Sequence, residues 1–243
     1  MIRAFFRRIW ETLRDGVRLW WLAPIIPLIS AIPEFAQHVA EIDMGMFASK
    51  EAFNALGNDP QRWAFGYFKI AGLVLAMFAA ARFWAVGKRW WDPRTIAWKP
   101  FLIGLGLNAI VTLILLPLDI AQEDNMAYQI ASAVITVVTL PLLVLMIGGL
   151  LGDREATLAG VYRSGWLKAI MIGLLFFGVM LGLQPLHQLN HTLAFGQPAW
   201  MVWALMVWDS VLVGTMAALA GTAFHHGYRS LREDLATISA RAV

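Results

Sequence analysis

The sequence predicts an all-α integral membrane protein with six transmembrane helices, preceded by an amphipathic helix that lies in the membrane interface. Composition gives the first reason: apolar residues make up 59% of the 243 residues and charged residues 14%, with a mean hydropathy of +0.63. Soluble domains are about 45–50% apolar and about 25% charged, so this chain lacks the charged surface of a soluble fold. The second reason is that Lys and Arg cluster beside the apolar segments.

The same composition excludes several classes of protein. A disordered chain, a collagen and a disulfide-stapled secreted domain do not fit it. The chain has no Cys, so thiolate metal sites and Cys nucleophiles are excluded as well. The sequence pI of about 9.4 indicates a membrane surface as the partner, and no nucleic acid, because the basic residues flank apolar segments.

Residues 1–18 are predicted to form the amphipathic helix at the cytoplasmic interface, with an end near Gly16. Apolar residues recur at helical spacing from Ile2 to Val17, while charged residues take the opposite face. This helix either orients the first span, binds the bilayer surface, or does both. Five basic side chains are expected to bind anionic lipids: Arg3, Arg7, Arg8, Arg14 and Arg18.

Six apolar segments are long enough to cross a membrane, which takes about 20 residues. They are 19–40, 65–86, 100–120, 128–151, 167–187 and 198–224. The first is the weakest, because three prolines interrupt it and Glu34 ends its apolar run. A re-entrant first segment is therefore the alternative. The six helices form one predicted domain, 19–226, with an outside loop at 41–64 and a cytoplasmic tail at 227–243.

The distribution of Lys and Arg predicts the orientation of the chain. Of these 19 residues, 16 lie in the N-terminal helix, the tail, and the second-to-third and fourth-to-fifth connections. Cytoplasmic loops of membrane proteins are enriched in Lys and Arg. Both termini are therefore expected in the cytoplasm, in a membrane such as the bacterial inner membrane, and the acidic loop 41–64 is expected outside.

Short recurring motifs indicate that the six spans are three helical hairpins of common origin. A Pro-containing corner recurs near residues 33, 117 and 185, and Gly closely followed by Arg recurs at 87, 152 and 227. Chance, or shared interfacial chemistry, is the alternative. Small residues four apart predict close helix packing, inside the bundle or in an oligomer, along three stripes: Gly72-Ala76-Ala80, Gly178-Gly182 and Gly214-Ala218-Thr222.

Five ionisable side chains fall at one depth, about 21–28 Å above the inner ends of their helices by helical rise. They are Glu34, Lys69, Asp119, His187 and Asp209. Ionisable groups inside a membrane usually pair, face the bundle interior or line water. We expect a structural polar network, with an outward-facing vestibule for a substrate or ion as the alternative. Asp209 is the deepest acid and Lys69 its expected partner, while Glu34 and Asp119 are expected to be solvated near the outer interface.

A metal site is a further interpretation of the same region. Glu34 with His38, and His187 with His191, are spaced so that each pair shares one face of a helix. Carboxylate and imidazole groups converging from two helices could bind a metal ion. Simple solvation of these histidines at the membrane edge is the expected alternative.

No motif indicates an enzyme. The chain has no His-Glu-x-x-His, no Gly-x-Ser-x-Gly, no phosphate-binding glycine loop and no dinucleotide fingerprint. We therefore expect a non-enzymatic scaffold or accessory subunit of a membrane complex, with partner subunits or further copies of the chain. The alternative is a small transporter or channel that uses the polar layer, which the proline-interrupted first span favours. The sequence identifies no cofactor.

Overall fold

The computed structural model describes the backbone of residues 2–121 and 125–229, and the side chains of residues 5–115 and 125–229. Within these residues the structure is helical, with short turns and no strand, which confirms the predicted all-α class. Nine α-helices are described in this part of the chain: α1 Ile2–Leu22, α2 Ile25–Asp43, α3 Lys50–Leu56, α4 Pro60–Val86, α5 Trp98–Ala121, α6 Met126–Leu150, α7 Leu158–Ser164, α8 Trp166–Ala194 and α9 Ala199–Tyr228. Three short 3-10 turns join them, η1 Met46–Ala48, η2 Gly87–Arg89 and η3 Pro93–Thr95.

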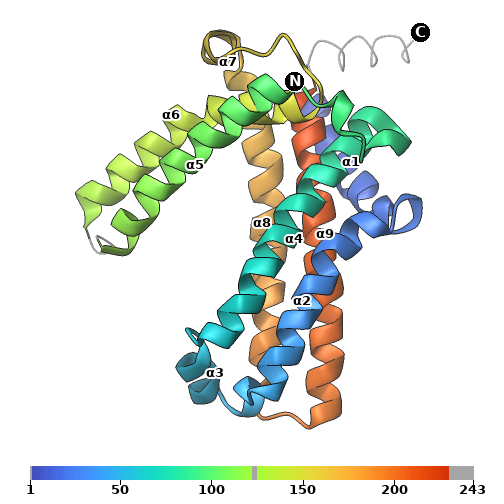
Figure 1. Ribbon diagram of the computed structural model, residues 1–243, viewed down its shortest axis with the longest axis vertical. Coiled ribbons are helices and arrows are strands. Elements are labelled where there is room, and N and C mark those ends of the chain that lie inside the picture. Colours follow the sequence, from blue (N-terminus) through green and yellow to red (C-terminus); the bar gives the residue numbers. More distant parts are fainter. Residues whose placement is uncertain (1, 122–124, 230–243) are drawn as a thin grey trace.

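Helices α2, α4, α8 and α9 form a bundle, in which α9 packs against both α8 and the α2–α4 pair. Helix α1, the start of α5 and helix α7 lie at one end of this bundle, the α1 end, and α3 lies at the other, the α3 end (Figure 1). Helices α5 and α6 pack against each other as a hairpin that leaves the bundle at an angle. The structure is therefore a bundle with a projecting hairpin rather than one six-helix bundle.

Five described helices are long and apolar enough to cross a membrane: α4, α5, α6, α8 and α9. Helix α2 meets this test only together with α1, and the two helices are bent by 85° at the break between them. The described part of the chain therefore has five candidate spans, or six if this bent pair counts as one. The first apolar segment, predicted to be the weakest span, is the one that does not meet this test by itself.

The break between α1 and α2 corrects two predicted boundaries. Residues 19–22, expected to begin the first span, continue α1, and Pro24 stands just before α2. Gly16, expected near the end of the helix, lies inside α1, which continues to Leu22. A Cβ at Gly16 would lie 2.5 Å from Leu219 Cδ2 and 2.9 Å from its Cα, so Gly16 allows α1 to touch α9.

Helix α1 is amphipathic as predicted. Phe6 and Trp10 are each 63% exposed on one side of it. On the side that packs against α9, Trp20 Nε1 donates a hydrogen bond of 3.0 Å to Thr215 Oγ1. Amphipathic helices with such apolar faces lie in the membrane interface, and the 85° bend from α2 is compatible with that placement.

Small residues pack the bundle, and two of the three predicted stripes lie at close contacts. Gly72 faces Ile29 O on α2, Gly214 faces Pro27 O on α2, and Gly221 faces Met77 O on α4. The third stripe differs, because a Cβ at Gly178 or Gly182 would meet nothing described within 4 Å. That stripe of α8 does not pack the bundle within the described residues.

Consecutive helices pair as α2 with α4, α5 with α6, and α8 with α9. These pairs are the hairpins that the recurring motifs predicted, although their common origin stays a prediction. In the α5–α6 hairpin, a Cβ at Gly149 would lie 2.2 Å from Phe101 N, so the helices touch there through backbone.

Arg82 has a structural role that the sequence analysis missed. It is buried near the end of α4, and its guanidinium donates hydrogen bonds of 2.6–2.8 Å to the connection that leads to α5 and to the end of α6. The acceptors are the carbonyls of Trp90, Asp92 and Leu150 and the hydroxyl of Thr95. The planar fork of donors in Arg suits this kind of multiple contact.

Candidate functional site

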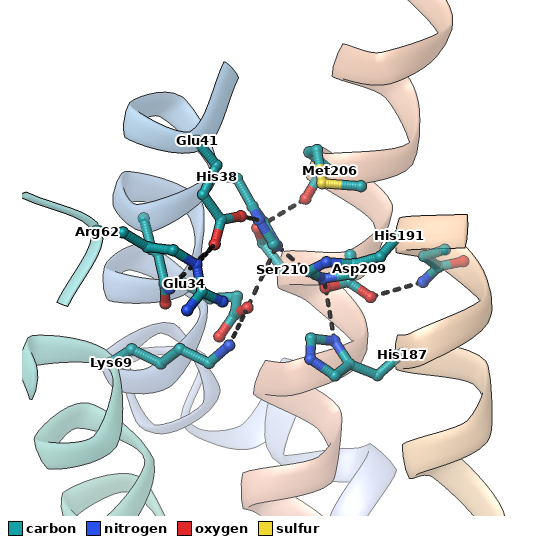
Figure 2. Close-up of polar contacts among 12 residues, drawn as sticks. Glu34, His38, Glu41, Arg62, Lys69, His187, His191, Met206, Asp209 and Ser210 are labelled. Atoms are coloured by element: carbon teal, nitrogen blue, oxygen red, sulfur yellow. Dashed lines mark hydrogen bonds and ion pairs between the residues drawn. The ribbon is translucent and has the colours of Figure 1, made fainter. Parts of the chain in front are cut away.

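A buried cluster of ionisable side chains lies between α2, α4, α8 and α9, toward the α3 end of the bundle (Figure 2). Helix spacing explains how three helices contribute to it. Glu34, His38 and Glu41 are four and three residues apart on α2, so they share one face. On α8, His187, Asn190 and His191 share a face in the same way, and α9 contributes Asp209. We call these seven side chains the polar cluster.

Asp209 lies at the centre of the polar cluster and is 0% exposed. Its Oδ1 accepts a hydrogen bond of 2.7 Å from Asn190 Nδ2. Its Oδ2 lies 2.7 Å from His187 Nδ1 and 3.0 Å from His38 Nε2. A buried carboxylate is stable only when hydrogen bonds and charges replace its water, and here α2 and α8 supply these partners.

His38 connects Asp209 to the two carboxylates of its own helix. Its Nε2 lies 3.2 Å from Glu34 Oε1, while its Nδ1 lies 2.9 Å from Glu41 Oε2 on the other side of the ring. Each ring nitrogen therefore faces a carboxylate oxygen. Because Glu41 holds Nδ1, the imidazole has a fixed orientation with Nε2 directed at Asp209 and Glu34.

Two cations from α4 neutralise the carboxylates of α2. Lys69 Nζ donates to Glu34 Oε1 at 2.8 Å, and Arg62 Nε donates to Glu41 Oε1 at 2.8 Å. The expected pair of Lys69 with Asp209 is wrong in this respect: Lys69 contacts Glu34, and Asp209 contacts histidines and Asn190. The expected solvation of Glu34 is also wrong, because that residue is fully buried.

His191 is the least satisfied member of the polar cluster. It is 6% exposed, and neither of its ring nitrogens has a hydrogen-bond partner among the described residues. Its Nε2 lies 3.5 Å from Asp209 Oδ2, and its ring packs edge-on against Phe47 and Phe53 of the η1–α3 segment. This segment covers the cluster at the α3 end. Glu34 Oε2 is a second buried atom without a described partner.

Four of these residues lie close enough together that they could hold a metal ion. One ligand atom from each of Glu34, His38, His191 and Asp209 can be chosen so that all four lie within 4.8 Å of one another. Tetrahedral Zn²⁺ with bonds of about 2.0–2.2 Å places its ligand atoms about 3.3–3.6 Å apart. The three contacts of 3.0–3.5 Å from His38 and His191 to the two carboxylates lie close to that spacing, whereas the limit of 4.8 Å for the whole set exceeds it, so the ligands would have to draw together around one ion.

The sequence analysis predicted most of this set. Glu34, His38 and His191 were expected as candidate ligands, whereas Asp209 takes the place expected for His187, which contacts Asp209 instead. Glu41 and Asn190 were missed, although each shares a helix face with a predicted ligand. Asp119 lies on α5, but its side chain falls outside the described residues.

The expected lipid-binding arginines of α1 are only partly available for lipid. Arg8 is 1% exposed and donates a hydrogen bond of 2.9 Å to Arg229 O, so its guanidinium is directed into the protein. Arg14 and Arg18 are more exposed and lie within 2.8 and 3.6 Å of Asp15. Arg7 lies 3.5 Å from Glu11. The side chain of Arg3 lies outside the described residues.

Comparison with known proteins gives no match: no protein-family model, no curated protein and no solved structure matches this chain.

Proposed function

We propose that this protein is an integral membrane protein that binds one divalent transition-metal ion in the polar cluster, through Glu34, His38, His191 and Asp209. The observation that supports this most is His191, a buried imidazole beside the Asp209 carboxylate with no described hydrogen bond to either ring nitrogen. Buried polar atoms are nearly always hydrogen-bonded. A metal ion bound at Nε2 would give this nitrogen a direct bond, whereas Asp209 Oδ2 lies 3.5 Å from it and makes no hydrogen bond.

The charges of the cluster are compatible with a bound cation. Glu34, Glu41 and Asp209 carry three negative charges, and Lys69 and Arg62 carry two positive charges. Both ring nitrogens of His38 face carboxylate oxygens, so a proton on His38 balances the third negative charge when no metal is bound. A metal ion bound at Nε2 would replace that proton and supply the balancing positive charge. Ionisable groups within a membrane protein usually pair or bind ions, because an unpaired charge is costly there.

The contacts around the proposed ligands resemble the second shell of a metal site. A metal-bound histidine usually donates its other ring N–H to a carboxylate, which orients the ring. Glu41 is positioned to accept from Nδ1 of His38, and Arg62 and Gln37 in turn donate to Glu41. Asn190 holds Oδ1 of Asp209, so Oδ2 remains directed at His38 and His191.

Two imidazoles and two carboxylates favour a borderline metal such as Zn²⁺, because soft thiolate ligands are absent from a chain without Cys. Nitrogen and oxygen ligands also suit Fe²⁺, Co²⁺ and Mn²⁺, and we take Zn²⁺ as the test ion. The bound ion is proposed as a retained component of a non-enzymatic accessory subunit or scaffold.

The experiment is metal analysis of protein purified in mild detergent, dialysed with excess Zn²⁺ and then freed of loosely bound ions. We expect about one Zn²⁺ per chain for the unmodified protein, as for a four-ligand site. The variant His191→Leu should lose it, whereas His225→Leu should retain it, because His225 lies at the α1 end of α9. Equal loss from both variants, or no bound metal in any, would overturn the proposal.

A transporter is the second candidate, and the shape of α2 favours it. This helix contains Pro33 and follows an 85° break after α1, and interrupted helices often line transport sites. Transport requires that the ion exchange across the membrane. The test is uptake of ⁶⁵Zn²⁺ by proteoliposomes. Uptake that is lost with Asp209→Asn would mean that the protein transports the ion through the same site and does not retain it.

We propose further that the α1 end faces the cytoplasm of a bacterial inner membrane. The excess of Lys and Arg in the segments at that end supports this orientation. The chain has no Cys, so single Cys residues at Lys50 and Arg94 can be labelled without background. A membrane-impermeant maleimide should label position 50 in intact cells and position 94 only after lysis. Labelling of position 94 in intact cells would reverse the orientation.

A further inference from the structure

A second candidate site lies at the α1 end of the bundle, whereas the polar cluster lies toward the α3 end. It is a cavity of about 550 Å³ between the start of α5, helix α6 and the connection that leads into α7. This volume is within the range of cavities that hold small organic molecules. Most of its lining is apolar, including Ile103 on α5, Leu145 on α6 and Leu158 on α7.

Two cations also line this cavity. Lys99 on α5 and Arg154 on the connection before α7 are both exposed, and neither has a hydrogen bond or ion pair with the described part of the chain. The neighbouring acids Asp153 and Glu155 line an adjoining cavity that shares Ala156 and Thr157 with this one, and Asp153 accepts a hydrogen bond there from the hydroxyl of Tyr228. The cavity therefore combines an apolar interior with two unneutralised positive charges.

The surroundings of the cavity fit the membrane interface. Trp98, also in the lining, is 46% exposed and precedes Lys99 at the start of α5. Tryptophan and basic residues concentrate where a transmembrane helix enters the headgroup region. Leu102, one turn further along α5, is exposed as a lipid-facing residue would be.

We propose that this cavity binds an anionic phospholipid, with its phosphate between Lys99 and Arg154 and the upper part of an acyl chain against Ile103 and Leu145. Arg and Lys are the side chains that bind phosphate groups, and the apolar lining continues from them into the α5–α6 hairpin. The site differs from the α1 arginines considered above. Lys99 and Arg154 have no described acidic partner, whereas Arg14 and Arg18 lie beside Asp15.

Native mass spectrometry of the detergent-solubilised full chain, titrated with phosphatidylglycerol or phosphatidylcholine, tests this. Phosphatidylglycerol should be retained more tightly than phosphatidylcholine. Removing both charges, by Lys99→Gln with Arg154→Gln, should weaken its retention by about fivefold for each cation and leave phosphatidylcholine unchanged. The matched control is Lys88→Gln with Arg94→Gln, two exposed basic residues outside the cavity lining, which should not change retention.

A second pair of variants tests the apolar part without changing charge. Ile103→Trp should fill the cavity and reduce phosphatidylglycerol retention, whereas Leu102→Trp, on the exposed neighbouring position, should not. Equal retention of the two lipids, or unchanged retention in both cavity variants, would overturn the proposal. Displacement of the lipid by millimolar inorganic phosphate alone would also overturn it, since the cavity would then be a site for free phosphate.

Discussion

His38 Nε2 on α2 lies 3.0 Å from Asp209 Oδ2 on α9. This contact joins the two helices through residues that are 171 positions apart in the chain. His38 and Asp209 are both buried. The other polar atom of each side chain is also in contact: His38 Nδ1 with Glu41, and Asp209 Oδ1 with Asn190. Such doubly held side chains have little freedom to turn, so the polar cluster is already organised around the position proposed for the metal ion.

The first prediction concerns His191, whose two ring nitrogens make no described hydrogen bond. Replacing His191 by Leu should leave the metal-free protein equally stable or more stable, because the change removes buried polar atoms that lack partners. Zn²⁺ at 100 times its dissociation constant should stabilise the unmodified protein by about 2.7 kcal/mol and the variant not at all. Thermal unfolding in detergent, with Zn²⁺ or with a chelator, measures both effects.

His225→Leu is the control, since His225 also has a buried unpaired ring nitrogen but lies at the other end of α9. It should keep the full response to Zn²⁺. Strong destabilisation of His191→Leu in the presence of chelator would mean that this histidine is a structural residue and would contradict the metal site.

The second prediction concerns Glu41, which contacts His38 but is not a proposed ligand. Glu41→Gln should weaken Zn²⁺ binding by about 10–100-fold, the usual cost of losing a second-shell carboxylate. Calorimetric titration with Zn²⁺ measures this affinity. Glu51→Gln, an exposed change on the nearby helix α3, should leave the affinity unchanged. An affinity that Glu41→Gln does not alter would show that Glu41 has no part in orienting His38.

The third prediction separates the two possible partners of Lys69. A double-mutant cycle of Glu34→Gln with Lys69→Met should give a coupling free energy of about 1–3 kcal/mol, because the two groups form a direct ion pair. The cycle of Asp209→Asn with Lys69→Met should give a smaller value. Unfolding in bicelles provides the free energies. Larger coupling to Asp209 would restore the pairing predicted from depth and contradict the contact with Glu34.

The sequence predicted the level at which each polar residue lies along its helix. It mostly did not predict which neighbouring helix each of these side chains faces. Counting residues placed Glu34, Lys69, His187 and Asp209 at one level. In the structure Glu34, His187 and Asp209 belong to the polar cluster, and Lys69 donates a hydrogen bond to Glu34 at its edge. The partner of Lys69 depends on which side of α4 packs against α2. Gly72, three residues after Lys69, faces Ile29 O on α2, so Lys69 is directed toward Glu34. The small-residue stripe was the available signal for this.

The projecting α5–α6 hairpin and the length of α1 could not be predicted from hydropathy, which reports whether a segment is apolar but not what it packs against. The same holds for Gly16. A glycine often ends a helix, yet Gly16 lies inside α1, and its lack of a side chain permits contact with Leu219 of α9.

The fourth prediction tests that contact. Gly16→Leu should destabilise the protein by about 1–3 kcal/mol, the cost of overpacking, because its Cβ would overlap Leu219. Gly178→Leu makes the same chemical change in α8, where nothing described lies within 4 Å of the new Cβ, and should be tolerated. Thermal unfolding of the two variants compares them. Equal effects would mean that α1 does not pack closely on α9.

The most direct test of the proposed metal site is X-ray absorption spectroscopy of the Zn²⁺-loaded protein. We expect four nitrogen or oxygen ligands at about 2.0–2.2 Å, with the outer-shell scattering of two imidazoles and no sulfur. The Asp209→Asn variant should lose this signal, and His225→Leu should retain it. A six-coordinate spectrum without imidazole scattering, or an unchanged spectrum in Asp209→Asn, would contradict binding of the ion by Glu34, His38, His191 and Asp209.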